Sequence, residues 1–211
     1  MLKVQVKLTL LTELLGTSSA NPALYEEFIA SKGDRAEEEI AALPAVPEEE
    51  LKKSTTVFHR NAEERPIIYD YQIKGFFKDA CGCLRRVKGS PSAALKAYKK
   101  EIDGLIFPEP RQIVLQLPDG AEIGICERPL RAQTAAGERI ALARSETVPA
   151  GTCLEFELTV LSDPLLDVIE SWLDYGKLRG LGQWRNSGRG RFEYDLEVLK
   201  QPKARAKVSG A

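Results

Sequence analysis

An α+β fold is predicted by three features of this 211-residue sequence. Apolar and polar residues alternate near both ends, which is typical of half-buried strands. Two segments have the apolar spacing of amphipathic helices, and further strand-like stretches lie between them. The resulting order of strand, helix, two strands or hairpins, helix and strand predicts a ferredoxin-like, or RRM-like, βαββαβ core with an extra β-hairpin and an acidic insertion.

The first predicted strand covers residues 3 to 10, where every second residue is apolar. Residues 17 to 65 follow as a polar stretch rich in acidic residues and proline, and we interpret this stretch as an insertion or loop. Within it, Asn21 before a proline predicts the start of a short helix over residues 22 to 31.

The first long helix is predicted over residues 72 to 87, because apolar residues recur there at helical spacing. From residue 111 the pattern changes to strands. Pro118-Asp119-Gly120 lies between two apolar stretches and suits the turn of a hairpin. A second pair of strands is predicted to join residues 139 to 145 with residues 154 to 161.

The second long helix is predicted over residues 163 to 175, with Asp163 as N-cap and Gly176 at its end. A Gly-rich loop over residues 180 to 190 leads to the last strand, residues 192 to 199. We expect the first and last strands to share one antiparallel sheet, with both long helices covering one face of it.

These elements predict one domain over residues 1 to 200, followed by a basic tail, residues 201 to 211, that we expect to be disordered. No segment approaches the roughly 18 consecutive apolar residues of a membrane span, and the N-terminus does not have the pattern of a signal peptide. A soluble, cytoplasmic protein without a membrane partner is therefore expected.

The four cysteines are predicted to be reduced and to bind no metal. Cys-x-Cys is not the common zinc-ligand spacing, and the only histidine of the chain is not near the cysteines. No cofactor is expected. The cysteines concerned are Cys81, Cys83, Cys126 and Cys153.

Charge is divided unevenly along the chain, although the formal net charge is only −1. Nine acidic residues stand against two bases in residues 23 to 51, whereas eight bases stand against one acid in residues 72 to 100 and nine against three in residues 176 to 211. Any binding of phosphate must therefore depend on bases gathered on one face. The same contrast predicts head-to-tail contacts between copies or with a homologous neighbour.

The Gly-rich loop has the form G-x-G-x-x-R-x-x-G-x-G, filled by Gly180, Gly182, Arg185, Gly188 and Gly190. Together with the strand and helix before it, this loop resembles the C-terminal half of RAMP proteins, a superfamily of CRISPR-associated proteins. The first strand and the Gln72-Ile73-Lys74-Gly75 start of the first helix are similar to the first half of that family, although its usual Pro-Gly-Ser-Ser is absent. The resemblance covers residues 1 to 16 and 66 to 199.

This resemblance implies a guide-RNA-binding backbone subunit of a CRISPR-type effector complex, with single-stranded RNA and other RAMP-like subunits or copies of itself as partners. The loop chemistry agrees, because glycines let backbone amides approach an anion and arginines bind phosphate in a bidentate manner. Trp184 is suited to stacking on an unpaired base. The predicted RNA-binding residues are Lys74, Lys78, Arg85, Gly180, Gly182, Trp184, Arg185, Gly188, Arg189, Gly190 and Arg191.

Three alternatives stay open. The loop glycines can form no more than a tight connection, with the arginines simply solvated. The chain can be a RAMP-like endoribonuclease, for which His59 and Asp34 are the candidate catalytic residues, although the glutamate runs show no geometry for a catalytic metal. It can also be a structural or phage-encoded protein that keeps the fold and contacts proteins through its acidic insertion. A binding protein is favoured over an enzyme.

Overall fold

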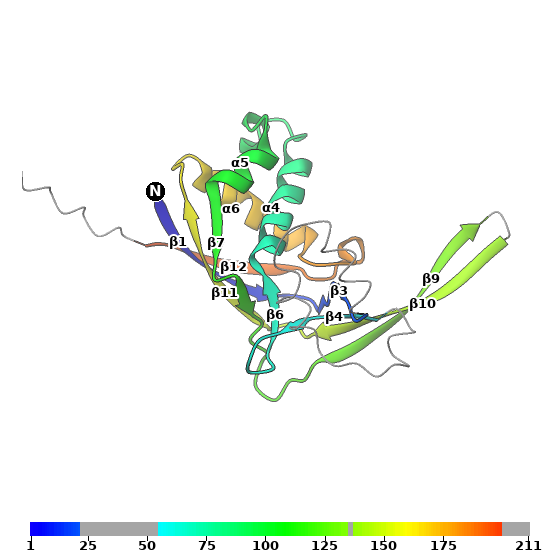
Figure 1. Cartoon of the computed structure of the whole chain (residues 1–211). Helices are drawn as coiled ribbons and strands as arrows, with labels where there is room; N and C mark the ends of the chain where they lie inside the picture. Colours follow the sequence, from blue (N-terminus) through cyan, green and yellow to red (C-terminus); the bar gives the residue numbers. More distant parts are fainter. Residues whose placement is uncertain (22–54, 135–136, 200–211) are drawn as a thin grey trace, which may run out of the picture.

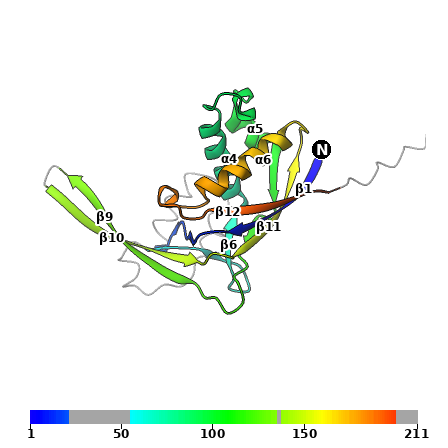
Figure 2. The same cartoon turned by 180° about the vertical axis from the view of Figure 1, so that it is seen from behind.

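The computed structural model describes residues 1–21, 55–134 and 137–199. Its central element is a four-stranded antiparallel sheet with the strand order β12-β1-β11-β7. Helices α4 (Asp70–Leu84) and α6 (Leu165–Arg179) lie on the same side of this sheet (Figures 1 and 2). The four strands are β1 (Leu2–Leu10), β7 (Ile106–Glu109), β11 (Cys153–Val160) and β12 (Phe192–Leu199).

Along the chain these elements run β1, α4, β7, β11, α6 and β12, which is the βαββαβ order of the ferredoxin-like fold. The predicted α+β class is confirmed. The expected pairing of the first and last strands is confirmed as well, since Leu8 of β1 lies opposite Tyr194 of β12.

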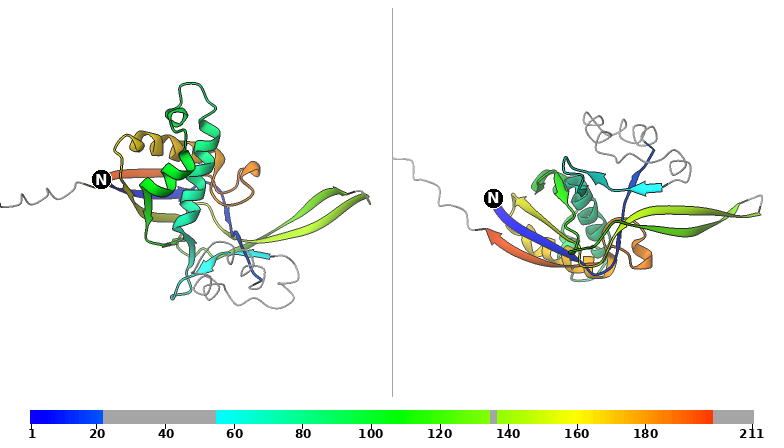
Figure 3. Two further views of the ribbon diagram at one scale, coloured as in Figure 1. Left: turned by 45° about the horizontal axis from the view of Figure 1, so that its top comes forward. Right: turned by 90° about the horizontal axis from the view of Figure 1, so that it is seen from below.

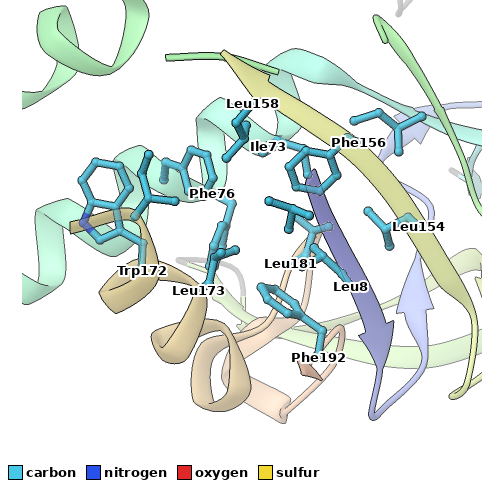
Figure 4. Packing of buried hydrophobic residues seen from close by; sticks show 14 of the residues in the cluster. Leu8, Ile73, Phe76, Leu154, Phe156, Leu158, Trp172, Leu173, Leu181 and Phe192 are labelled. Carbon is cyan, nitrogen blue, oxygen red and sulfur yellow. The ribbon is translucent and has the colours of Figure 1, made fainter. Parts of the chain in front are cut away.

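The period-two pattern of β1 explains which face of the sheet meets the helices. Val4, Val6, Leu8 and Leu10 are all buried, and a shift of one residue would turn all four toward the open face. Figure 4 shows side chains of the sheet and of both helices gathered in one core, where Phe76 of α4 meets Phe192 of β12 edge to face at 5.3 Å between ring centroids.

Helix α6 continues past Gly176, where its end was predicted, to Arg179. A Cβ atom on residue 176 would lie 2.1 Å from Cζ of Phe192, so this glycine makes room for an aromatic ring rather than ending the helix. Gly180 ends the helix instead, with a φ of +78°.

A hairpin of β9 (Gly124–Thr134) and β10 (Gly137–Val148) projects from the body of the protein (Figures 1 and 3). The hairpin predicted around Pro118 is wrong, because β8 (Gln112–Val114) pairs with β6 (Pro66–Tyr69) instead of with β9. The predicted pairing of residues 139–145 with residues 154–161 is also wrong. Eleven residue pairs join β9 to β10, far more than the three of β8 with β6.

Strand β7 was not predicted, because Pro108 within it indicates a break. An edge strand tolerates proline, and β7 is at the edge of the central sheet. The flanks of the predicted insertion also form strands: β3 (Ser18–Ser19) pairs with β4 (Thr55–Val57), and β4 pairs with β10. The remaining short strands are β2 (Leu14–Leu15), paired with β10, and β5 (His59–Arg60), paired with β6.

The helix predicted over residues 22 to 31, Asp34 and the basic tail lie outside the described residues. Within the described residues, no helix is long and apolar enough to cross a membrane. The cysteines form no disulfide, and the described residues contain no group of three or more His, Cys, Asp or Glu side chains placed to hold a metal ion.

Candidate nucleic-acid interface

The Gly-rich loop between α6 and β12 is closed at its neck by main-chain contacts. The amide of Leu181 donates a hydrogen bond to the carbonyl of Gly190 at 2.8 Å. A Cβ atom would lie 2.3 Å from the carbonyl oxygen of Arg189 if it were on residue 180, and 2.1 Å from that of Leu181 if it were on residue 190. Gly182 and Gly188 also have positive φ values, both +76°. The glycines of the motif therefore give the loop its shape.

The loop is also held from outside. Gly190 donates its amide to the carbonyl of Glu13 at 2.8 Å, and the hydroxyl of Thr12 donates to the carbonyl of Gly188 at 2.8 Å. The side-chain amide of Gln183 donates to the hydroxyls of Thr56 at 2.7 Å and Ser145 at 3.0 Å. The segment after β1 and the strands β4 and β10 thus fix the loop before any ligand binds.

Two arginines share one carboxylate at the junction of this loop with α4. Oδ2 of Asp79 accepts hydrogen bonds from Arg185 at 2.7 Å and from Nε of Arg179 at 3.2 Å. The side chains of all three residues are about a quarter exposed. Because two positive charges meet one negative charge, the cluster keeps one positive charge in excess, in contact with water and available to an anion.

The other predicted loop residues are engaged to different degrees. Arg189 forms an ion pair with Glu13, so its charge is neutralised. Nε of Arg191 donates to the carbonyl of Lys177 at 2.6 Å, a neutral acceptor that leaves the charge of Arg191 in place.

Trp184 directly precedes the 3-10 turn η2 (Arg185–Ser187) and lies in the left-handed region, with a φ of +58°. Its ring already stacks against the guanidinium of Arg128 from β9, at 3.8 Å from the ring centroid. Arg128 is only 7% exposed, and within the described residues its Nε has no hydrogen-bond partner. A base can therefore stack only on the part of the indole that Arg128 leaves uncovered.

The basic side chains predicted on the first long helix point away from the Gly-rich loop, toward α5 (Tyr98–Leu105). Nζ of Lys74 donates to the carbonyl of Asp103 at 3.2 Å, and burial lowers the pKa of Lys74. Lys78 forms an ion pair with the Asp103 carboxylate at 2.6 Å, and Arg85 stacks on the ring of Tyr98.

The structure therefore does not join the α4 bases and the loop arginines in one cluster. Lys78 and Asp79 are neighbours in the sequence, but successive residues of a helix project about 100° apart. Lys78 reaches Asp103 on one flank of α4, whereas Asp79 reaches Arg185 on the other.

Exposed lysine and arginine residues lie close together in the sequence where α4 ends and α5 begins, around the 3-10 turn η1 (Pro91–Ala94). Residues 80 to 100 contain no acidic residue, so nothing in this stretch offsets their charge. Apart from Arg85, none of these basic residues is among the RNA-binding residues predicted from the sequence. We call this surface the cationic end: Arg85, Arg86, Lys88, Lys96, Lys99 and Lys100.

The face of the central sheet opposite α4 and α6 is acidic. Lys3 and Lys7 of β1 lie there, and each forms an ion pair with a glutamate of β11. Register and alternation put six acidic residues on this face: Glu109, Glu155, Glu157, Glu193, Asp195 and Glu197. RRM domains stack bases on aromatic residues of this sheet face, and a surface of carboxylates does not suit that mode of RNA binding.

His59, the candidate catalytic histidine, is enclosed in the protein interior. The residue is 2% exposed, with Nδ1 at 3.0 Å from the hydroxyl of Ser18 and the ring edge-on to Tyr69. Burial first, and the charge of Arg60 second, lower its pKa to about 4. A general acid or base must come within hydrogen-bond reach of the phosphodiester, so catalysis by His59 would require the residues that cover it to move.

The βαββαβ core, with its projecting hairpin, defines an α+β protein of ferredoxin-like fold. The Gly-rich loop beside this core carries an excess of positive charge. No family model and no curated protein matches the sequence. Among solved structures, the chain is similar to one in the cryo-EM structure of the Type III-B Cmr-beta bound to cognate target RNA, with a TM-score of 0.55 and 15% sequence identity over 94% of this chain.

That match covers 61% of the other chain, so the present chain spans about three fifths of its length. A chain of a Type IV-B CRISPR Complex is similar with a TM-score of 0.49 and 11% identity, covering 99% of this chain and 95% of that one. At such identities the Type III-B likeness shows a shared fold.

Proposed function

We propose that this chain is an RNA-binding, RAMP-like subunit of a CRISPR-type effector complex, which holds single-stranded guide RNA and contacts homologous subunits or copies of itself. The observation that carries the proposal is the shared carboxylate: Arg179 and Arg185 meet one Asp79 beside a preformed Gly-rich loop. The fold shared with a chain of an RNA-bound Type III-B structure supports the same function.

Electrostatics favours the helix side of the molecule for the RNA backbone. The open face of the sheet carries six carboxylates and would repel phosphate, whereas the loop and the cationic end both adjoin α4. We infer that the RNA runs from Arg185 toward Lys88 and the lysines of α5. Contacts to the phosphate backbone carry no sequence information, so RNAs of different sequence should bind with similar affinity.

Arg185→Ala tests this proposal without leaving a buried charge unpaired, because Asp79 keeps its contact with Arg179. We expect weaker binding of an unstructured RNA of about 30 nucleotides, a length above the roughly 4 to 16 nucleotides covered by a small single-strand-binding domain. The slope of log K against log salt should fall by about 0.7 for the lost phosphate contact. Fluorescence anisotropy at several salt concentrations measures both quantities.

Arg65→Ala is the matched control, since Arg65 also pairs with a carboxylate, that of Glu63, but lies in the turn before β6. It should bind RNA like the unchanged protein. The triple variant Lys96→Ala, Lys99→Ala and Lys100→Ala should lower the slope by up to about 2, at about 0.7 per contact. Equal affinity and slope in all of these proteins would contradict RNA binding on this side.

A further inference from the structure

A cavity of about 300 Å³ lies beside the Gly-rich loop, between the start of α4 and the segment that follows β1. None of the contacts described so far fills it. Its lining residues come from five parts of the chain that the fold brings together. Those that determine its chemistry are Thr17, Phe58, Gln72, Gly75, Phe76 and Arg185.

The walls are mainly apolar and include two phenylalanine residues, Phe58 and Phe76. Only a few of the lining side chains are polar. The amide of Gln72 is held by its own contacts: Nε2 donates to the hydroxyl of Thr17 at 2.7 Å, and Oε1 accepts from the amide of Tyr69 at 2.8 Å. The second N–H of Nε2 and the hydroxyl hydrogen of Thr17 can each donate one more hydrogen bond.

Arg185 belongs both to this cavity and to the cluster with excess positive charge. A ligand seated here would therefore have an apolar, flat part against the phenyl rings, acceptor atoms near Gln72, and a negative charge near the guanidinium. A nucleotide combines these three properties. The cavity is at the lower end of the roughly 300 to 1,000 Å³ of small-molecule sites, which suits one base and not two.

We propose that this cavity binds one unstacked base of the RNA, with the phosphate of that nucleotide at Arg185. The inference rests on the proposed function and deepens it, since single-stranded RNA is commonly bound with bases splayed out against aromatic side chains. A base held in this way adds affinity without adding charge contacts.

Gly75 makes a direct test possible. It lines the cavity from α4, and a Cβ atom on it would meet nothing within 4 Å, so Gly75→Leu adds a bulky apolar side chain at the wall of the cavity without a clash at its Cβ. Leucine is a better helix former than glycine, so the variant is expected to fold. Gly104→Leu is the matched control, because Gly104 is also a helical glycine with nothing within 4 Å but lies in α5, outside the cavity.

The experiment measures binding of a 5′-labelled, unstructured RNA of about 30 nucleotides and of the same backbone made without bases, in protein with and without each substitution. We expect Gly75→Leu to weaken RNA binding by roughly 5- to 150-fold, the loss typical of one stacked base, with an unchanged salt slope. Binding of the abasic strand should not change, and Gly104→Leu should bind both strands like the unsubstituted protein.

Each other outcome overturns the inference in a recognisable way. Normal RNA binding by Gly75→Leu would leave the proposed function standing and exclude the cavity as a base site. An equal loss with the abasic strand would mean that the leucine disturbs backbone contacts. If the unsubstituted protein binds neither strand, the proposed function fails together with the inference, and the cavity is left for a side chain of a protein partner.

Discussion

The single histidine of the chain predicts how stability depends on pH. His59 is buried between Ser18 and Tyr69, and its pKa falls from 6.5 to about 4. In the unfolded chain the imidazole takes up a proton near its ordinary pKa, whereas in the folded protein it stays neutral to a much lower pH. The unfolded state therefore binds more protons as the pH falls, and the contribution of His59 to stability, complete above about pH 6.5, is lost between about pH 6.5 and pH 4.

The size of this effect follows from the two pKa values. A difference of about 2.5 between them corresponds to about 3 to 4 kcal/mol at roughly 1.4 kcal/mol per pKa unit. Between pH 7 and pH 5 the loss should be about 2 kcal/mol. Water hardly reduces this cost of protonating the buried imidazole, because His59 is 2% exposed.

Urea unfolding at pH 7 and pH 5 measures the free energy of unfolding directly. His59→Asn is the reference, because asparagine can keep a polar atom near the Ser18 hydroxyl but does not titrate. Carboxylates titrate in both proteins and cancel in the comparison, so the unsubstituted protein should lose about 2 kcal/mol more than the variant. The proton NMR signal of this one imidazole gives an independent readout that does not need the variant. A midpoint near 6.5 in the folded protein would refute the reasoning.

Two further predictions concern packing and assembly. Gly176→Ala should cost about 1 to 3 kcal/mol of unfolding free energy, because the new methyl group meets the ring of Phe192 at 2.1 Å; Gly75→Ala, in open space on α4, should instead be neutral or stabilising by up to about 1 kcal/mol in the same thermal or urea unfolding. The contrast between the acidic sheet face and the cationic end predicts head-to-tail association that weakens with salt. A monomeric mass by light scattering at high concentration, with and without RNA, would contradict it.

The sequence predicts that β1 and β12 share one sheet because the signal in these two strands is local and repeated. In β1 and β12 every second residue is apolar, and only one register puts both buried faces toward the helices. The hairpin is different, since short apolar stretches lie on both sides of a good turn at Pro118. The local pattern is compatible with either pairing, and the segment after the turn pairs with β10 because that longer ladder forms more main-chain hydrogen bonds.

Polar residues misled the prediction for the opposite reason. The flanks of the predicted insertion contain the polar residues Ser18, Thr55 and Thr56, which we assigned to the loop with the rest of that polar stretch, yet all three lie in strands. Thr56 shares a hydrogen bond with Ser145 of β10 at 2.8 Å, and Gln183 of the Gly-rich loop donates to both hydroxyls. Hydrogen bonds between segments far apart in the sequence make these polar residues part of the folded interior, and no window of neighbouring residues contains that information.

The candidate site shows the same limit for charge. Counting along the chain gives eight bases and one acid in residues 72 to 100, which marks a positive segment correctly but treats Asp79 as a minor exception. In the folded protein Asp79 is the residue that connects α4 to the loop, because it holds Arg179 and Arg185 together. Lys78, next to it, is neutralised by Asp103. The positive charge that an RNA phosphate would meet therefore depends on which carboxylate each lysine or arginine contacts. Because adjacent residues of a helix point in different directions, they contact different partners.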